Sequence, residues 1–170
     1  MVKNAEPEGL ELLGDGEQFR EELYSMIENA PMFNSLSHHE VELLAGYFRG
    51  YQAKKGVTIF KEGDKGHFMC VVVTGRVDIF KDTPEHGKKK VATVRPGKSM
   101  GEMSLLDDLP YSATSVAHED SSFLMLTKMN FERLTEEQPM LSNKLLMQVA
   151  RLMSLRLRQT TGILLDYIDQ

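Results

Sequence analysis

The chain has 170 residues, a formal net charge of −5 at neutral pH and a hydrophobic fraction of 41%. This length indicates one domain with a terminal extension, and the hydrophobic fraction is ordinary for a globular protein. The acidic balance argues against a surface devoted to nucleic acid, and no run approaches the roughly 18 apolar residues of a membrane span.

The N-terminal stretch and the single cysteine bear on location. Residues 1–15 are acidic, carry glycine and proline, and lack the apolar centre of a secretory signal, so we expect a flexible segment there. Cys70 lies in an apolar run and has no partner for an intrachain disulfide. A buried thiol and a cytoplasmic location are therefore expected, because the cytosol keeps thiols reduced.

Two helices are predicted before the first strand. Glu17–Asn29 has apolar residues at helical spacing, and Pro31 ends it. Ser37 and Glu40 have the spacing of a capping box, which opens a second helix through about Phe48. The two adjacent histidines in its first turn have no third ligand in view, so we predict a solvated helix start rather than a metal site.

From Gly50 onward the apolar residues recur with the period of two that is typical of strands, and glycine turns separate the runs. Short strands of this kind predict a small β-barrel or jelly roll, and the order helix, strands, helix predicts an α+β layout rather than βαβ repeats. Lys88–Lys90 are interpreted as a solvated hairpin end, with a docking patch for an acidic partner as the alternative. The predicted strands are Val57–Phe60, Phe68–Thr74, Arg76–Lys81, Val91–Arg95, Ser112–Ala117 and Ser121–Leu126.

Helical periodicity dominates the C-terminal part of the chain. Asn130 is the candidate cap of a short helix at Phe131–Glu137, and from Leu141 a longer helix runs nearly to the end. The near-heptad seam of this helix either packs entirely within the chain or also contacts a second copy, and we expect a homodimer through Leu146–Tyr167. The seam residues are Leu146, Val149, Met153, Leu157, Thr160, Leu164 and Tyr167.

The stretch Pro96–Ala117 is predicted to hold the functional site. Gly101 marks a turn, Glu102–Leu109 is long enough for about two helical turns, and Pro110 cannot continue a helix. The start of such a helix presents free N–H groups and a positive dipole end, where an anion such as a phosphate binds. The alternative is a plain helix start at which Glu102 favours the dipole.

Within this stretch, MGEMSLLDDLPYSATSVA resembles the phosphate-binding cassette of cyclic nucleotide-binding domains. The segments APMFNSLSHHEVELLAGYF and KKGVTIFKEGDKGHFMCVVVTGRVDIF are similar to the same family, so the resemblance covers roughly residues 30–168. It implies an α+β fold, a β jelly-roll barrel with N-terminal helices, a short cassette helix and a long C-terminal helix. The expected organisation is a flexible segment at 1–15, the domain at 16–140 and a lid or dimerisation helix at 141–170.

The resemblance also implies a cyclic nucleotide, cyclic AMP or cyclic GMP, as the ligand. The backbone N–H groups of Met103 and Ser104 would hold the cyclic phosphate, and Glu102 would accept a hydrogen bond from the ribose 2′-hydroxyl. The hydroxyl of Ser112 would add a further bond. The predicted ligand-binding residues are Gly101, Glu102, Met103, Ser104, Tyr111, Ser112 and Ala113.

Tyr111 departs from the family pattern, which has at this position an arginine that pairs with the phosphate. Losing such a contact costs about 2–5 kcal/mol, or about thirtyfold to several thousandfold in affinity. We therefore expect micromolar or weaker binding of cyclic AMP, or none. Tyr111 is either a wall residue or a residue that stacks on the ligand or donates to it. Candidate substitutes for the missing charge are Arg76, Arg95 and Lys98.

Two function hypotheses follow. The first is a regulatory module that senses a cyclic nucleotide or a related ligand and transmits binding through the C-terminal helix. The second is a degenerate domain that binds no nucleotide and serves in dimerisation or partner docking. An enzyme is not expected, because no catalytic triad spacing, Cys/His cluster or Walker-type loop is present. No helix-turn-helix follows the long helix before Gln170, so direct DNA reading is not expected.

Overall fold

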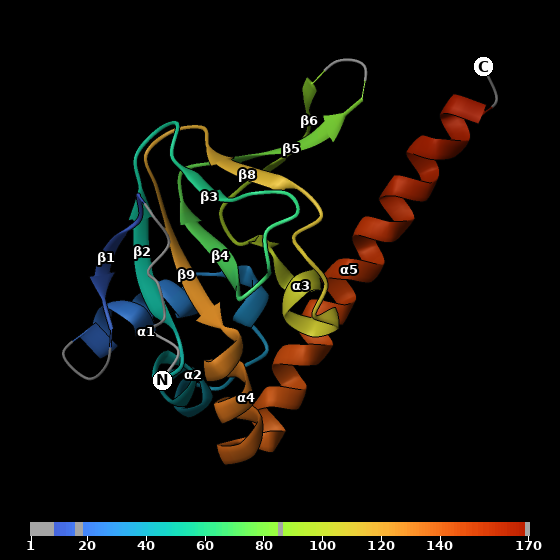
Figure 1. Cartoon of the computed structure of the whole chain (residues 1–170). Helices are drawn as coiled ribbons and strands as arrows, with labels where there is room; N and C mark the ends of the chain where they lie inside the picture. The colour runs from blue at the N-terminus through green and yellow to red at the C-terminus, as the bar shows by residue number, and fades with distance from the viewer. Residues whose placement is uncertain (1–8, 16–18, 85–86, 169–170) are drawn as a thin grey trace.

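The computed structural model describes residues 9–15, 19–84 and 87–168, with the backbone alone for 166–168. Two antiparallel sheets form a barrel, shorter helices gather at one end of it, and a long C-terminal helix stands along its side (Figure 1). The predicted α+β jelly-roll arrangement is confirmed. No described helix combines the length and apolar character needed to cross a lipid bilayer.

Nine strands make up the barrel in the described part of the chain. One sheet has the order β1-β2-β9-β4-β7 and the other the order β3-β8-β5-β6. Lys88–Lys90 are exposed at the hairpin end of β5 and β6, as predicted, although β6 already begins at Gly87 and not at Val91. The strands are β1 (Glu11–Gly14), β2 (Arg49–Ala53), β3 (Thr58–Phe60), β4 (Phe68–Thr74), β5 (Val77–Thr83), β6 (Gly87–Val94), β7 (Ser99–Met100), β8 (Thr114–Ala117) and β9 (Ser121–Thr127).

The helices end close to where the sequence predicts. The capping box is confirmed, because Ser37 accepts a bond from the Glu40 backbone N–H while the Glu40 carboxylate accepts one from the Ser37 N–H. The cap of the fourth helix is corrected: Thr127 accepts from the Asn130 N–H, so Asn130 is not the cap itself. The helices are α1 (Arg20–Glu28), the 3-10 turn η2 (Pro31–Phe33), α2 (His38–Ala45), α3 (Glu102–Asp107), α4 (Lys128–Glu137) and α5 (Pro139–Ile168).

The N-terminal segment is partly ordered, contrary to the flexible stretch expected over residues 1–15. Glu11–Gly14 form the edge strand β1, which pairs antiparallel with β2 through Leu12 opposite Tyr51. The Gln52 amide also donates to the Glu11 carboxylate at 2.6 Å. Residues 1–8 lie outside the described residues. Composition does not predict β1, because the backbone partners of this strand come from the edge of β2.

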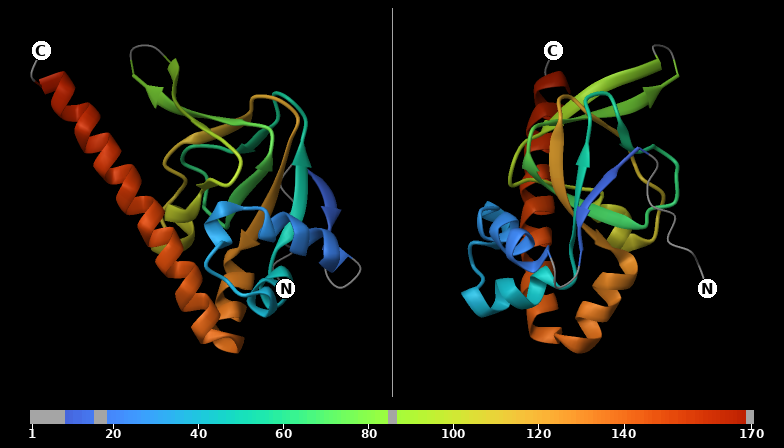
Figure 2. Two further views of the ribbon diagram at one scale, coloured as in Figure 1. Left: turned by 180° about the vertical axis from the view of Figure 1, so that it is seen from behind. Right: turned by 90° about the vertical axis from the view of Figure 1, so that its left-hand side faces the viewer.

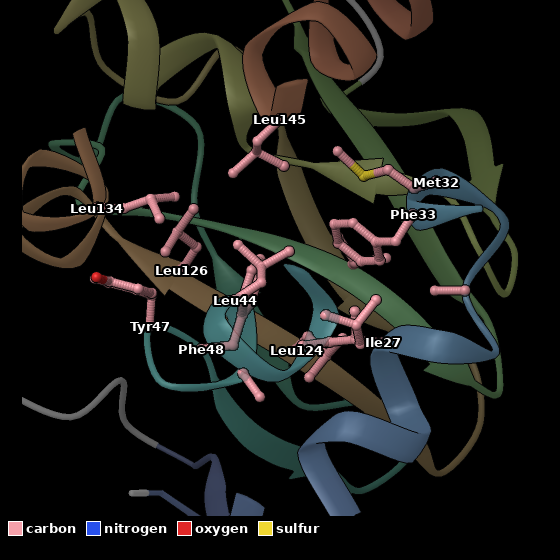
Figure 3. Close-up of a cluster of buried hydrophobic side chains, with 14 of the residues drawn as sticks. Ile27, Met32, Phe33, Leu44, Tyr47, Phe48, Leu124, Leu126, Leu134 and Leu145 are labelled. Atoms are coloured by element: carbon pink, nitrogen blue, oxygen red, sulfur yellow. The ribbon is translucent and has the colours of Figure 1, made fainter. Parts of the chain in front are cut away.

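Strand β4 is buried on both faces, which explains its continuous apolar run. Met69 and Val71 belong to a cluster formed with the N-terminal helices and the first half of α5 (Figure 3). Cys70 and Val72 belong to a second cluster inside the barrel. Cys70 is fully buried as predicted, and burial raises the pKa of its thiol. Buried side chains of this second cluster therefore fill much of the barrel interior.

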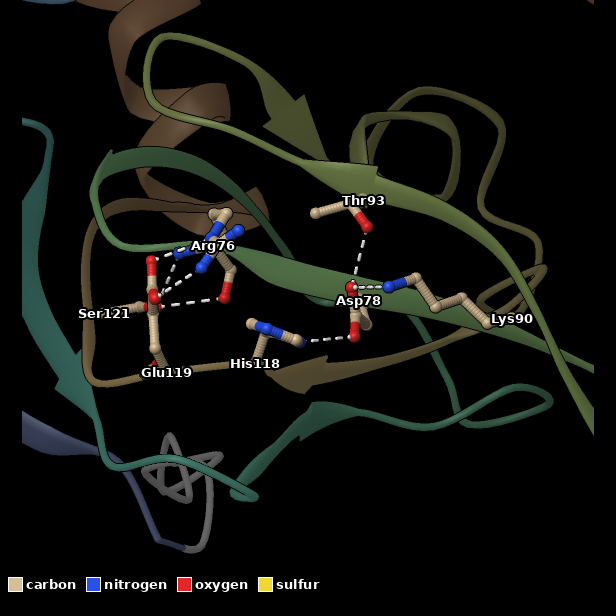
Figure 4. A network of polar contacts seen from close by, with 7 residues as sticks. All are labelled: Arg76, Asp78, Lys90, Thr93, His118, Glu119 and Ser121. Carbon is tan, nitrogen blue, oxygen red and sulfur yellow. Dashed lines mark hydrogen bonds and ion pairs between the residues drawn. The ribbon is translucent and has the colours of Figure 1, made fainter.

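A polar network fastens β5 to its neighbours (Figure 4). The buried carboxylate of Asp78 accepts a bond from Thr93 Oγ1 at 2.7 Å and lies 2.8 Å from Lys90 Nζ and 2.9 Å from His118 Nδ1. Burial alone would raise the pKa of Asp78, but these hydrogen bonds and the Lys90 charge outweigh it and lower the pKa to about 2. The network therefore stabilises the fold only while Asp78 is ionised.

Asp78→Asn is expected to lower the free energy of unfolding by about 2 kcal/mol at neutral pH. Because the pKa of Asp78 is depressed in the folded state, its contribution is complete above the unfolded pKa of about 3.9 and is lost as the pH falls toward the folded value. Urea unfolding across the acid range should show wild type and variant converging at low pH. Exposed Asp64, changed to Asn, is the control, and a gap that persists at the acid end contradicts the prediction.

Candidate functional site

The site is built around the start of the short helix α3. Gly101 precedes this helix with φ 79°, a left-handed conformation that glycine adopts without strain. A Cβ at this position would lie 3.0 Å from the Phe68 carbonyl oxygen and 3.2 Å from Cε1 of Tyr111. No side chain caps the first turn of α3. The predicted glycine turn is therefore confirmed, and it brings the helix start against β4 and Tyr111.

Tyr111 is a wall residue whose hydroxyl is already engaged. Its ring stacks on Phe60 with centroids 4.1 Å apart and an interplanar angle of 14°. The hydroxyl donates to the Phe68 carbonyl at 2.9 Å and accepts from the backbone N–H groups of Phe68 and His67 at 3.2 and 3.3 Å. Burial raises the pKa of the phenol, so it stays neutral. The structure thus favours the wall interpretation over donation to a ligand.

Glu102, the first residue of α3, is bridged to α5 by an arginine. One oxygen of its buried carboxylate pairs with Arg156 Nη1, while Nη2 of the same guanidinium donates to the Ser99 carbonyl. Oε2 of Glu102 and Oγ of Ser99 are buried and have no hydrogen-bond partner among the described residues. Two buried polar atoms beside the site therefore have unused hydrogen-bonding capacity, which is uncommon among buried groups.

A cavity of about 480 Å³ collects these groups between α3, the second sheet and α5. Such a volume is within the range of small-molecule sites. The lining includes Phe60, Ile79 and Leu155 on its apolar side. All of the predicted ligand-binding residues line it, namely Gly101, Glu102, Met103, Ser104, Tyr111, Ser112 and Ala113. The structure brings these residues to one place, and their role in binding stays a prediction.

The cation that contacts Glu102 is not one of those predicted as substitutes. Arg76 pairs with Glu119 in the polar network of Figure 4, and of the three candidates only exposed Lys98 lines the cavity. Arg156 takes this place instead, from a helix 54 residues further along the chain than Glu102. No sequence signal separates Arg156 from the other arginines of the long helix; the structure places it, with Thr160, on the cavity side of α5.

The two aspartates at the end of α3, Asp107 and Asp108, do not add negative charge to the cavity. Asp107 and Asp108 are exposed and are not part of the lining. Asp107 accepts from the Leu109 N–H at 3.0 Å, and Asp108 pairs with Lys128 at the start of α4. Both aspartates therefore lie outside the cavity, and Glu102 is the one carboxylate among the described residues that line it.

The long helix α5 changes character along its length. Leu141, Leu145 and Val149 are buried in the core beside η2 and α4. The second half projects away from the barrel (Figure 2), and its exposed apolar side chains include Leu157 and Leu164. Part of the predicted seam therefore packs within the chain and part does not. The side chain of Tyr167 lies outside the described residues.

Comparison with known proteins agrees with this geometry. The family model of the cyclic nucleotide-binding domain matches residues 52–138, about half of the chain. The Cyclic AMP receptor protein of Thermus thermophilus is 33% identical over 133 residues, covering 78% of this chain and 60% of that protein. A cAMP-dependent protein kinase regulatory subunit of Colletotrichum orbiculare is 32% identical, covering 64% of this chain and 27% of that protein.

A solved structure extends the likeness to nearly the whole chain. The cyclic nucleotide-binding domain from Methylobacillus flagellatus is 31% identical, with a TM-score of 0.81 and coverage of 94% of this chain and 89% of that chain. By contrast, the chain spans less than two thirds of the length of the two curated relatives. The likeness therefore concerns the domain and not the complete activities of those longer proteins.

Proposed function

Because the chain belongs to the cyclic nucleotide-binding domain family, we propose that it is a regulatory module that binds a cyclic nucleotide or a related ligand and passes the signal to α5. The observation that carries the proposal is the contact between Glu102 and Arg156 at the cavity wall. A ligand that reaches Glu102 acts on the same carboxylate that holds α5, so binding and helix position are linked.

We propose that the affinity for cyclic AMP is weak. The place of the family's arginine is taken by the neutral, buried Tyr111, and the nearest guanidinium is already paired with Glu102. A cyclic phosphate would meet the start of α3 without a free bidentate cation, which is the group that binds phosphate most strongly. The sequence-based expectation of micromolar or weaker binding is therefore retained as part of this proposal.

The output of the module is proposed to run through a homodimer formed by the second half of α5. This half carries a set of exposed apolar side chains that the barrel leaves uncovered, and exposed apolar patches mark contact surfaces. A cytoplasmic location fits the unpaired Cys70. The exposed apolar side chains of this half that do not line the cavity are Leu157, Leu164 and Leu165.

NMR titration of the ¹⁵N-labelled protein with cyclic AMP, cyclic GMP and adenosine tests the proposal. We expect shifts at Glu102, Ser104 and Ala113, and also at Arg156 on α5. Arg156→Gln should keep the cassette shifts but lose those along α5, whereas Arg151→Gln, an exposed change on the same helix, should behave as wild type. The proposal fails if no ligand of this panel shifts the cavity residues.

A further inference from the structure

Large apolar side chains that water reaches surround the opening of the cavity. Val91 of β6 is 54% exposed, and Leu155 and Ile163 of α5 are 48% and 59% exposed. All three line the cavity, as does exposed Met103 of α3. Single exposed apolar residues are ordinary, but several that gather around one hollow mark a binding surface. These four side chains, the apolar rim, therefore have surface that a ligand can remove from water.

The cavity wall behind the apolar rim is also largely apolar. The buried rings of Phe60 and Tyr111 stack on each other and line it, together with buried Met100. Ile79 of β5 and Leu152 of α5 add aliphatic surface from the sheet and from the helix. Flat rings pack well against aromatic and aliphatic groups of this kind. A ligand in this space of about 480 Å³ therefore meets mostly apolar atoms.

The charged groups of the lining offer an anionic ligand no free partner inside the cavity. Among the described residues, three that line it are charged: Lys98, Glu102 and Arg156. Lys98 is exposed, so solvent screens its charge. Glu102 is buried and pairs with Arg156. An anion that displaced Glu102 would leave a buried carboxylate without its counter-charge, which is strongly unfavourable, whereas an uncharged ligand leaves the pair in place.

Several polar side chains of the lining already bond within the protein. The hydroxyl of Tyr111 bonds to backbone groups of His67 and Phe68. The hydroxyl of Thr93 donates to a carboxylate of β5, and that of Thr160 donates to a backbone carbonyl of α5. The lining therefore suits a ligand with few polar groups of its own, because a polar group that is buried without a partner costs free energy.

We infer that this cavity takes an uncharged, largely apolar ring compound in preference to an anionic ligand. The inference rests on the proposed function, because it names the ligand class of the same regulatory cavity. Such a compound covers the apolar rim and the inner rings and needs no counter-ion. Its affinity comes from apolar surface removed from water, and the volume is that of a small-molecule site.

Fluorescence titration with N-phenyl-naphthylamine, an uncharged probe that emits more strongly in apolar surroundings, is the primary test. Its sulfonated analogue, anilinonaphthalene sulfonate, has the same rings and one negative charge, so the pair isolates the effect of charge. The uncharged probe is expected to bind about tenfold or more tightly than the sulfonate. Equal or tighter binding of the sulfonate, or no binding of the uncharged probe, contradicts the inference.

Two leucines of α5 show whether the probe binds in the cavity. Leu155→Ser should weaken binding of the uncharged probe by about fivefold or more, because apolar contact surface is lost. Leu157→Ser changes another exposed leucine that does not line the cavity and should leave the affinity unchanged. Both side chains lie outside the buried core, so both variants should fold. An affinity that depends on Leu157 rather than Leu155 would place the probe between copies of the chain and overturn the assignment.

Cyclic AMP, titrated under the same conditions, separates this inference from the proposed function. If cyclic AMP binds in the cavity and the uncharged probe does not, the inference is wrong while the proposed function stands. If the probe binds in the cavity and the nucleotides do not, the ligand class stands and the nucleotide-binding part of the proposed function fails. If neither binds, both fail.

Discussion

Replacing Tyr111 with arginine is expected to raise the affinity for cyclic AMP by about thirtyfold to several thousandfold. The variant places a bidentate cation beside the free N–H groups at the start of α3, which is the contact that the present cavity lacks. Titration calorimetry measures the gain directly. Adenosine carries no phosphate and should gain nothing from the same change, so it serves as the control ligand.

The variant also has a structural cost that serves as an internal check. It loses the stacking of Tyr111 on Phe60 and three hydrogen bonds to the backbone of His67 and Phe68, and it buries a guanidinium. We therefore expect a lower melting temperature that cyclic AMP restores by binding the folded state. Tyr111→Phe keeps an aromatic ring and adds no positive charge, so it should show no gain in affinity for cyclic AMP. If the arginine variant folds but binds no better, the cavity differs from the family at more than this position.

Leu157→Glu combined with Leu164→Glu is expected to convert a dimer into a monomer. The two positions are about two helical turns apart on one face of α5, away from Arg156 and the cavity. Each leucine contributes about 1.5–3 kcal/mol when fully buried, and a two-fold symmetric contact buries each position twice. The dissociation constant should therefore rise by at least about a thousandfold.

Sedimentation velocity over a range of protein concentrations checks this expectation. Arg158→Glu introduces the same side chain on a face about 100° around the helix from Leu157 and should leave the dimer intact. The cavity lies on a different side of α5, so ligand binding by the double variant should be close to that of wild type. A wild-type protein that stays monomeric at high concentration rules out the homodimer.

The strands and the cassette were predictable because their signals are local. The apolar run Phe68–Thr74 is a strand with those bounds, and Gly101 takes the left-handed conformation that its place before a short helix predicts. The capping box at Ser37 is equally local, since both of its bonds span three residues. Each of these features is specified by neighbours in sequence, which is why no tertiary information was needed.

The features that the sequence did not predict are those decided by distant partners. Strand β1 depends on the free edge of β2, and its sequence Glu11–Gly14 has no clear strand pattern of its own. Arg156 looks like one of several solvated arginines on a long helix until the fold places it against Glu102. The engagement of the Tyr111 hydroxyl likewise depends on how the cassette returns beside β4. Pairings across 36 to 54 residues leave no periodic trace in a single sequence.

The attachment of α5 at Arg156 makes the second half of this helix a lever. The guanidinium is tied to β7 and α3 near the middle of the helix, and from there the helix continues to Ile168, with exposed side chains from Leu157 to Leu165. Twelve residues beyond the attachment span about 18 Å, so a tilt of about 10° at this fulcrum displaces the tip by about 3 Å. In the proposed function, a change too small to disturb the barrel would thereby be enlarged to the size of a side-chain contact at the far end.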